Sequence, residues 1–406
     1  MAGPLAGIRV LEFSQVIAAP FAGQILADLG AEVLKVEPPG GESWRLQSSF
    51  APAESKSYQC LNRGKDDMTL RLDKPEAQEI VHRLVVDMDV VLINYRPDAP
   101  AKFHIDYATL SAIKPDLVYV DLTAFGRRGD WAMRPGYDGA VQAVSGLMAA
   151  EGKTRPDDGS PATISSSAVA DYSSGYVLAD AVISGLYHRE MTGEGQMIEC
   201  SLLASALNLQ PHVVMEHAIA DAAVRNPARD RRRERSAQGA PYEELLGIRN
   251  PDDPHNIFYR AYLTRDGGIV IAAETPNEIS AVYGFFDVDP STIDAGIVGD
   301  VERKIESLST AEWVTRLQRA GIPTAPIQFS EEMTSNPHVE ANGWIVELEH
   351  EVTGRQTQVS LPLVFSATPL ARPVAAPRLG RDTRRILQRL GYSEETVARL
   401  KHEGII

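Results

Sequence analysis

IRVLEFSQVIAAPFAGQILADLGAEVLKVE, residues 8–37, decides the fold of this chain. Residues 8–13 and 32–37 are rich in β-branched and apolar side chains and are typical of buried strands. Between them, the small and apolar residues of 18–30 end in a glycine, as helices often do. A strand, a helix and a strand within about 30 residues form a βαβ unit, whose right-handed crossover makes a parallel sheet. The stretch therefore predicts an α/β fold.

The same alternation continues along the N-terminal half of the chain. Helices are predicted near residues 75–88 and 107–113, and strands at 89–93 and 117–122. Sustained alternation predicts a Rossmann-like parallel sheet, and the loop of residues 14–18 leaves the carboxyl end of the first strand, where such sheets bind ligands. No Gly-x-Gly-x-x-Gly follows that strand, so we do not expect NAD.

Composition changes between residues 218 and 256, where residues 225–235 read RNPARDRRRER. We expect a linker here, because an arginine run inside an acidic chain is more often a solvated crossing or a subunit contact than a nucleic-acid site. A second α/β pattern follows. The predicted organisation is a large domain in residues 1–217 and 346–406, linkers at 218–256 and 331–345, and a small α/β domain at 257–330.

Charge and cysteine content restrict the partners of the 406-residue protein. Its net charge of −15 opposes docking on nucleic acid or an anionic membrane, so neither is an expected partner. No apolar run reaches the length of about 18 residues that a membrane span needs. Only Cys60 and Cys200 are present, which excludes a disulfide framework or a cysteine metal site and favours a reducing, cytoplasmic compartment.

Asp171 is the candidate catalytic residue. It lies in SSSAVADYSSG, residues 165–175, at the head of a long apolar segment that ends at Thr192-Gly193-Glu194-Gly195. Small neighbours leave room for a large ligand, and the first turn of the predicted buried helix should favour the charged, nucleophilic carboxylate. Taken alone, Asp171 is explained as well by a helix-capping role. The motifs elsewhere in the chain favour the catalytic interpretation.

An ordered set of short motifs covers nearly the whole chain and closely resembles the family III CoA-transferases. This CaiB/BaiF family includes formyl-CoA and carnitine CoA-transferases and is related to the α-methylacyl-CoA racemases. Each motif is weak alone, but their order is specific. The motifs are Val10–Ser14, Leu26–Gly41, Leu61–Lys65, Asn94–Pro97, Arg134–Asp138, Ala170–Tyr172, Thr192–Gln196 and Pro377–Gly380.

The resemblance implies that Asp171 is the family's nucleophilic aspartate. Its carboxylate would attack an acyl-CoA thioester, form a mixed anhydride, and pass through an aspartyl-CoA thioester before an acceptor acid takes the CoA. The reaction needs no metal and no redox cofactor, since coenzyme A and acyl-CoA are substrates. The resemblance also implies an obligate homodimer whose two chains thread through each other as interlocked rings.

Further site residues follow from the same resemblance. The loop Gln15-Val16-Ile17-Ala18 would face the thioester end of CoA, and a tyrosine would lie near the nucleophile. Ile17 stands where formyl-CoA transferases carry a glutamine, and their glycine-rich loop is not evident near Gly267-Gly268, so transfer among other acids is favoured. The implied CoA-binding residues are Gln15, Val16, Ile17, Ala18, Arg45, Asn94, Tyr95 and Lys102, with Tyr137 beside the nucleophile.

Two alternatives remain open: an α-methylacyl-CoA racemase or other acyl-CoA isomerase of the same superfamily, and a non-catalytic protein. A racemase would need a histidine where this chain has Tyr137, and a tyrosine with a pKa near 10 is a poor base, which favours the transferase. A non-catalytic CoA-binding protein is the alternative from another class, and the presence of Asp171 speaks against it. The donor, the acceptor acid, and transfer between or within molecules are not distinguished by these residues.

Overall fold

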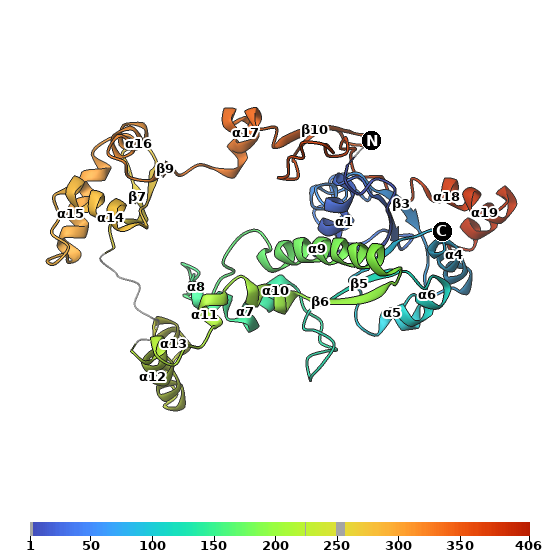
Figure 1. Cartoon of the computed structure of the whole chain (residues 1–406), viewed down its shortest axis with the longest axis horizontal. Coiled ribbons are helices and arrows are strands. Elements are labelled where there is room, and N and C mark those ends of the chain that lie inside the picture. The colour runs from blue at the N-terminus through green and yellow to red at the C-terminus, as the bar shows by residue number, and fades with distance from the viewer. Residues whose placement is uncertain (1–2, 224, 249–255) are drawn as a thin grey trace. The chain divides into compact units, whose positions relative to one another are not determined.

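The structure is a computed structural model that describes residues 3–223, 225–248 and 256–406. Two compact units form the chain (Figure 1). The first contains the residues up to His217 together with Glu340–Ile406, and the second contains Ala218–Val339. In the described part of the chain, every helix is too short or too polar to span a bilayer.

A six-stranded parallel sheet organises the first unit, as the sequence predicts. Its strands lie in the order β3-β2-β1-β4-β5-β6, so the chain winds outward in both directions from β1 and β4. The strands are β1 (Arg9–Phe13), β2 (Glu32–Glu37), β3 (Asp66–Thr69), β4 (Val90–Ile93), β5 (Val118–Thr123) and β6 (Gln196–Ser201). Strands β3 and β6 were not predicted.

Successive residues of the strands supply two separate cores, one on each face of the sheet. Val10 packs in the core with α1 (Ala18–Asp28) and α9 (Val169–Thr192). Leu11 packs in the opposite core with α4 (Pro75–Val85) and α6 (Tyr107–Ile113). The predicted helices near 75–88 and 107–113 are thus confirmed, and they cover the second face of the sheet.

Helix α9 begins two residues before Asp171, which lies in its first turn as predicted, and it ends at Gly193 with φ of 78°. The expectation that it is buried holds for only one side. Tyr176, Ile183 and Tyr187 are 48%, 41% and 68% exposed and share one helical face.

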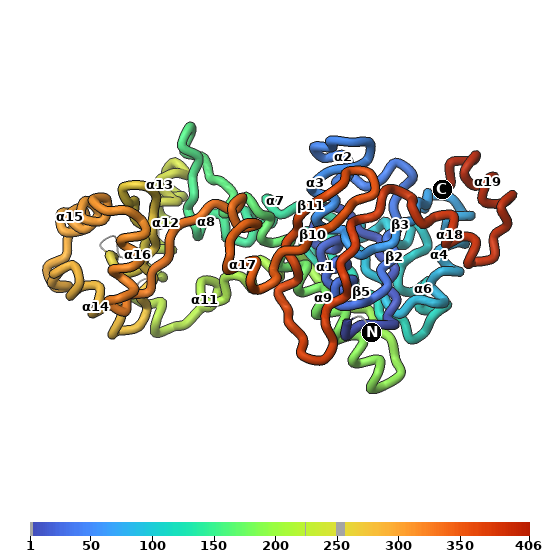
Figure 2. Tube along the Cα trace, turned by 90° about the horizontal axis from the view of Figure 1, so that it is seen from above, coloured from blue at the N-terminus to red at the C-terminus, as the bar shows by residue number. Residues whose placement is uncertain are grey.

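The C-terminal segment returns to the first unit and covers the edge of the sheet at β3. Asp382 accepts a hydrogen bond from the backbone N–H of Asp67 at 3.0 Å, and Thr383 accepts one from Thr69 at 3.0 Å. These contacts occupy donors that an edge strand would otherwise expose. The segment contains the hairpin β10 (Ile345–His350) and β11 (Gly354–Val359), then α18 (Thr383–Arg389) and α19 (Glu394–His402); Figure 2 shows its path.

The second unit is built on a small antiparallel sheet in the order β7-β8-β9. The strands β7 (Tyr259–Leu263) and β8 (Gly268–Ala272) pair as an antiparallel hairpin, and β9 (Thr324–Pro326) completes the sheet. Its helices are α14 (Pro276–Phe286), α15 (Ala295–Glu306) and α16 (Thr310–Arg319). The segment expected as a linker contains α12 (Arg225–Ala237) and α13 (Tyr242–Gly247), which Arg235 and Glu244 join by an ion pair.

Short elements connect the larger ones. In the first unit these are α2 (Ser43–Leu46), α3 (Lys56–Gln59), α5 (Ala99–Lys102), α7 (Asp138–Ser145), α8 (Leu147–Glu151), α10 (Leu202–Asn208) and α11 (Pro211–Val214). The others are α17 (Pro337–Ala341) and the 3₁₀ helices Ala220–Ala222 and Ser330–Ser335.

Candidate active site

The order of the strands reverses between β1 and β4, and open α/β sheets bind ligands at such a point. The loops that leave these two strands are joined here by one side chain. The Asn94 amide accepts a hydrogen bond from the Gln15 N–H at 3.0 Å and donates one to the Gln15 carbonyl at 2.8 Å. Asn94 therefore holds the loop after β1, whereas the sequence predicted a ligand contact.

A cavity of about 680 Å³ opens at this end of the sheet. Its volume lies within the range of about 300–1,000 Å³ typical of ligand pockets. Three of the predicted CoA-binding residues, Gln15, Tyr95 and Lys102, line it. Arg71 and Arg96 lie in the same walls, and the acidic side chains there are Glu42, Asp73 and Asp98.

The loop between the cavity and α1 contains one residue with a strained backbone. Val16 has a φ of 71°, a left-handed conformation that is rare for a β-branched residue and is often found at functional sites. Its N–H donates to Glu42 Oε2 at 3.0 Å. Ile17 follows as the N-cap of α1, where no side chain caps the helix, and Ala18 is buried in the first turn.

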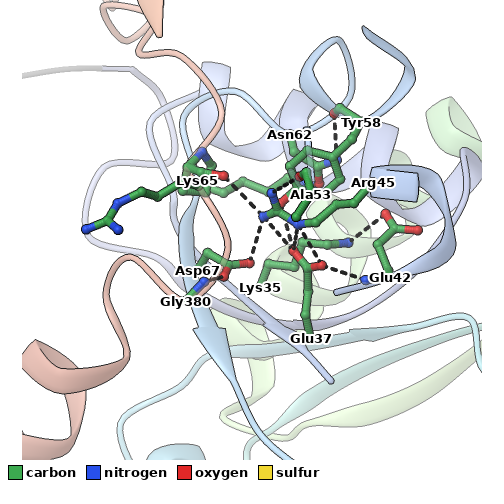
Figure 3. A network of polar contacts seen from close by, with 12 residues as sticks. Lys35, Glu37, Glu42, Arg45, Ala53, Tyr58, Asn62, Lys65, Asp67 and Gly380 are labelled. Atoms are coloured by element: carbon green, nitrogen blue, oxygen red, sulfur yellow. Dashed lines mark hydrogen bonds and ion pairs between the residues drawn. The ribbon is translucent and has the colours of Figure 1, made fainter. Parts of the chain in front are cut away.

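Arg45 does not line this cavity, because its side chain is fully buried in a network of charged groups (Figure 3). The strand register explains the network, since Glu12, Lys35 and Asp67 occupy matched positions on β1, β2 and β3. Arg45 Nη2 lies 2.9 Å from Glu37 Oε1 and also donates to the Pro377 carbonyl at 3.1 Å. Arg45 therefore ties the β2 end to the C-terminal segment, which differs from its expected place along the CoA channel.

The buried carboxylates of this network are balanced by cations. Burial raises the pKa of Glu37, but a hydrogen bond with Asp67 and the charge of Arg45 outweigh it and lower the pKa to about 2. Asp67 shows the opposite direction, since burial and the neighbouring Glu37 raise its pKa. We interpret the pair as one proton held by Asp67 and shared with an ionised Glu37.

Asp171 is buried in a different environment. Its side chain lies in the first turn of α9, and burial, followed by the charge of Asp138, raises its pKa to about 7. The expectation that the helix terminus favours the charged form is therefore wrong. The Asp138 side chain accepts from the backbone N–H of Ala170 at 2.7 Å and of Asp171 at 3.4 Å, so it occupies donors that would have stabilised Asp171.

Asp138 was missed as a site residue, although it lies in the motif that contains Tyr137. Tyr137 is the N-cap of α7, and its side chain is 67% exposed in this unit. The adjacent residue makes the contact with α9, because α7 begins at Asp138. Gln142, one turn later on α7, donates to Asp138 Oδ2 at 2.6 Å and fixes the carboxylate.

A glycine lets the loop and the nucleophile candidate approach each other. A Cβ at Gly175 of α9 would lie 2.6 Å from Phe21 Cδ1 and 3.0 Å from the Ala18 carbonyl oxygen. The Phe21 ring packs edge-on against Tyr172, with 5.0 Å between ring centroids. The first turn of α1 thus contacts α9 one turn after Asp171, although Asp171 is not among the residues that line the cavity.

Across the described ranges, no cluster of three or more His, Cys, Asp or Glu residues is arranged to hold a metal ion.

The known proteins similar to this chain include several CoA-transferases. The chain is 33% identical to the succinate–glutarate CoA-transferase of Agrobacterium fabrum, over 97% of each chain. It is 28% identical to the succinyl-CoA:glutarate CoA-transferase of Homo sapiens, over 99% of this chain and 90% of the relative.

Solved structures agree with these relatives. The crystal structure of Rv3272 from Mycobacterium tuberculosis matches with a TM-score of 0.76 and 28% identity over 95% of this chain and 99% of that one. A CaiB/BaiF family protein from Brucella suis matches with a TM-score of 0.74 and 26% identity over 96% of this chain and 100% of that one. The family model of CoA-transferase family III matches residues 5–383, and the chain is therefore a member of this family and a CoA-transferase.

Proposed function

We propose that this transferase moves coenzyme A from an acyl-CoA thioester to a carboxylic acid through covalent intermediates on Asp171. The observation that carries the proposal is the environment of Asp171, a buried carboxylate with a pKa raised to about 7, on a helix that contacts the first turn of α1 one turn later, at Gly175. At neutral pH a large fraction of such a group is ionised, and its poor solvation increases its reactivity toward a thioester.

The proposed reaction proceeds in balanced steps. The Asp171 carboxylate attacks the thioester carbonyl, forms a mixed anhydride and releases CoA thiolate. The thiolate then attacks the aspartyl carbonyl of the anhydride, which releases the donor acid and leaves an aspartyl-CoA thioester. The acceptor carboxylate attacks this thioester, which forms a second mixed anhydride and releases CoA thiolate. The thiolate then attacks the acceptor carbonyl of this anhydride, which gives acceptor CoA and frees the Asp171 carboxylate. No metal or redox cofactor takes part in these steps.

The cavity at the carboxyl end of β1 and β4 is the proposed CoA site. Arg71, Arg96 and Lys102 in its walls suit the phosphate groups of CoA, and Gln15 and Tyr95 line the same space. The loop continues through Val16 and Ile17 into α1, whose first turn contacts α9 at Gly175. We assign to the uncapped N-terminus of α1 the N–H groups that stabilise the developing oxyanion.

Small dicarboxylic acids are the proposed acyl carriers. The relatives from Agrobacterium fabrum and Homo sapiens are named for succinate, succinyl-CoA and glutarate. Transfer between two such acids would use the same covalent chemistry whichever acid is donor.

Both cysteines, Cys60 and Cys200, are free thiols, and we propose a cytoplasmic location in keeping with this.

We further propose that the enzyme is an obligate dimer of two interlocked chains. The support is α9, which exposes Tyr176, Ile183, Tyr187 and Met191 on one face while its other side is buried in the first unit. A helix with apolar residues on both sides is typical of a buried position. A second copy of the chain would cover this face. Sedimentation velocity should give twice the 44.3 kDa chain mass at every concentration, and a monomer would contradict the proposal.

One experiment tests the catalytic proposal. The protein is incubated with succinyl-CoA and a panel of acids in deuterated water, and the exchange of CoA and the entry of deuterium at the α-carbon are measured. We expect transfer without deuterium, a loss of more than about a thousandfold in Asp171→Ala, and a hydroxylamine-sensitive adduct on Asp171. An adduct on another residue, or transfer that survives in Asp171→Ala, would overturn the mechanism.

A further inference from the structure

The loop after β1 owes its shape to side chains that come from other parts of the sheet. Asn94 makes both hydrogen bonds of the Gln15 peptide groups, as described above. Lys35, fully buried on β2, donates to the Ser14 carbonyl at 2.9 Å. The next backbone donor, the Val16 N–H, is bound by Glu42. All of these partners lie more than 20 residues away in sequence, so the conformation of the loop is held by contacts from outside it.

Glu42 makes the contact at the strained residue. Its side chain is buried, and Oε2 accepts hydrogen bonds from Val16 N at 3.0 Å and from Trp44 N at 3.1 Å. The other oxygen lies 3.6 Å from Lys35 Nζ, which orients the carboxylate (Figure 3). The Glu42 N–H donates to Glu37 Oε2 at 2.8 Å, which anchors the backbone of this residue in the charged network.

The left-handed conformation of Val16 has a high conformational energy and needs stabilising contacts. A left-handed φ brings the Cβ of a valine against its own backbone, and such residues persist only where surrounding contacts determine them. The conformation also decides where the next residues point. Val16 lies between Gln15, which lines the cavity, and Ile17, the N-cap of α1. A change at Val16 would therefore redirect the N–H groups that face the reacting thioester.

We propose that Glu42 is a positioning residue for the transfer reaction, and that its hydrogen bond to Val16 N–H holds the loop in its strained, reactive conformation. Glu42 also lines the cavity, but the proposed role acts through Val16 and not through a contact with CoA. The inference rests on the proposed CoA site and extends it to a residue that supports the loop. It also gives a function to one part of the buried charged network, because Lys35 aligns Glu42 for this contact.

Two conservative variants separate positioning from simple charge balance. Glu42→Asp keeps the charge that faces Lys35 but withdraws the oxygen from Val16 N–H by one methylene. Glu42→Gln removes the charge and keeps an oxygen at full reach. We expect Glu42→Asp to lose about tenfold in kcat with little change in KM for acyl-CoA, and Glu42→Gln to retain most of kcat. The reverse pattern would show that Glu42 acts only as a counterion and would overturn the proposal.

Val16→Gly provides the rescue. Glycine adopts a left-handed φ without steric cost, so the double variant Glu42→Asp with Val16→Gly should be about tenfold more active than Glu42→Asp alone. Contacting residues that share one role give non-additive effects. The same fold-change for Val16→Gly in the wild-type and Glu42→Asp backgrounds would contradict the coupling.

A readout that needs no turnover keeps this inference separate from the proposed function. Hydrogen exchange of the peptide that contains residues 14–18 should be slow in wild type and Glu42→Gln and faster in Glu42→Asp, with the second unit unchanged. If exchange responds in this way but no CoA is transferred by wild type, the loop inference stands and the proposed function fails. If exchange does not respond, the inference fails even in an active transferase.

Discussion

Two buried acidic residues of the first unit, Glu37 and Asp171, have pKa values shifted in opposite directions, although both are hidden from solvent. Glu37 lies in the network with Arg45 and Lys35, and its pKa falls to about 2. Asp171 lies beside another carboxylate, Asp138, and its pKa rises to about 7. The comparison shows that the neighbouring charge, not burial alone, sets the ionisation of a buried acid. In this enzyme the compensated acids hold the fold together, and the uncompensated one is the candidate nucleophile.

The largest effect should follow from removing the cation of the compensated group. Arg45→Ala leaves Glu37 buried without its partner, and breaking a buried pair in this way costs about 3–5 kcal/mol of the free energy of unfolding. Urea denaturation measures the loss. Arg83→Ala is the matched control, because Arg83 pairs with Glu79 on the exposed side of α4 and its loss should change the free energy of unfolding far less. Equal losses in the two variants would show that the network does not stabilise the fold.

Removing the charge of Asp171, the uncompensated acid, should stabilise the fold where removing Arg45 destabilises it. Asp171 has a pKa of about 7 in the folded chain and an ordinary value near 3.8 when unfolded, so folding favours its protonated form. The contribution of Asp171 to the free energy of unfolding is greatest below pH 4, and it is lost as the pH rises through about 7. Asp171→Asn mimics the protonated form, so it should exceed wild type by about 2–4 kcal/mol at pH 8 and by little at pH 4.

Thermal or urea unfolding of both proteins across pH 4–8, at one protein concentration, measures this difference. A stability difference that does not change with pH would contradict the raised pKa. The same variant should have no transferase activity, so a gain in stability would accompany a loss of function at one position.

A smaller change should sharpen the comparison. Asp138→Asn keeps an oxygen that accepts from Ala170 N–H but removes the charge beside Asp171. Burial is the larger cause of the raised pKa and remains, so the pKa of Asp171 should fall by about one unit or less and stay above its ordinary range. The pH dependence of kcat for CoA transfer measures this pKa. We expect the rise of kcat with pH to occur at lower pH in the variant. An unchanged pH dependence would mean that Asp138 acts only through its hydrogen bonds.

Sequence reasoning predicted the elements whose signal is local. The strand 32–37 and the helix 107–113 have the predicted bounds, because their periodicity and boundaries are contained in the segment. Asp171 was placed correctly in the first turn of α9 for the same reason. Strand β6 was missed because its residues, Gln196–Ser201, alternate little and are half-buried.

The properties that were not predicted depend on distant partners. Arg45 looked available for a ligand because its contact with Pro377, 332 residues away, cannot be inferred from either segment alone. The raised pKa of Asp171 comes first from its burial and then from the charge of Asp138, whose side chain reaches the start of α9 across 32 residues. A helix terminus favours an anion only while its N–H groups are unoccupied, and here another carboxylate already binds them.

The closing of the sheet edge at β3 has a consequence for how the protein is made. Asp382, which binds the Asp67 N–H, is 315 residues further along the chain. At translation rates of about 5–20 residues per second, β3 emerges from the ribosome tens of seconds before the residue that covers it. During that interval the second unit is synthesised while the first still has an open strand edge. The nascent chain must therefore be protected from pairing with its neighbours on the same messenger RNA until its last segment arrives.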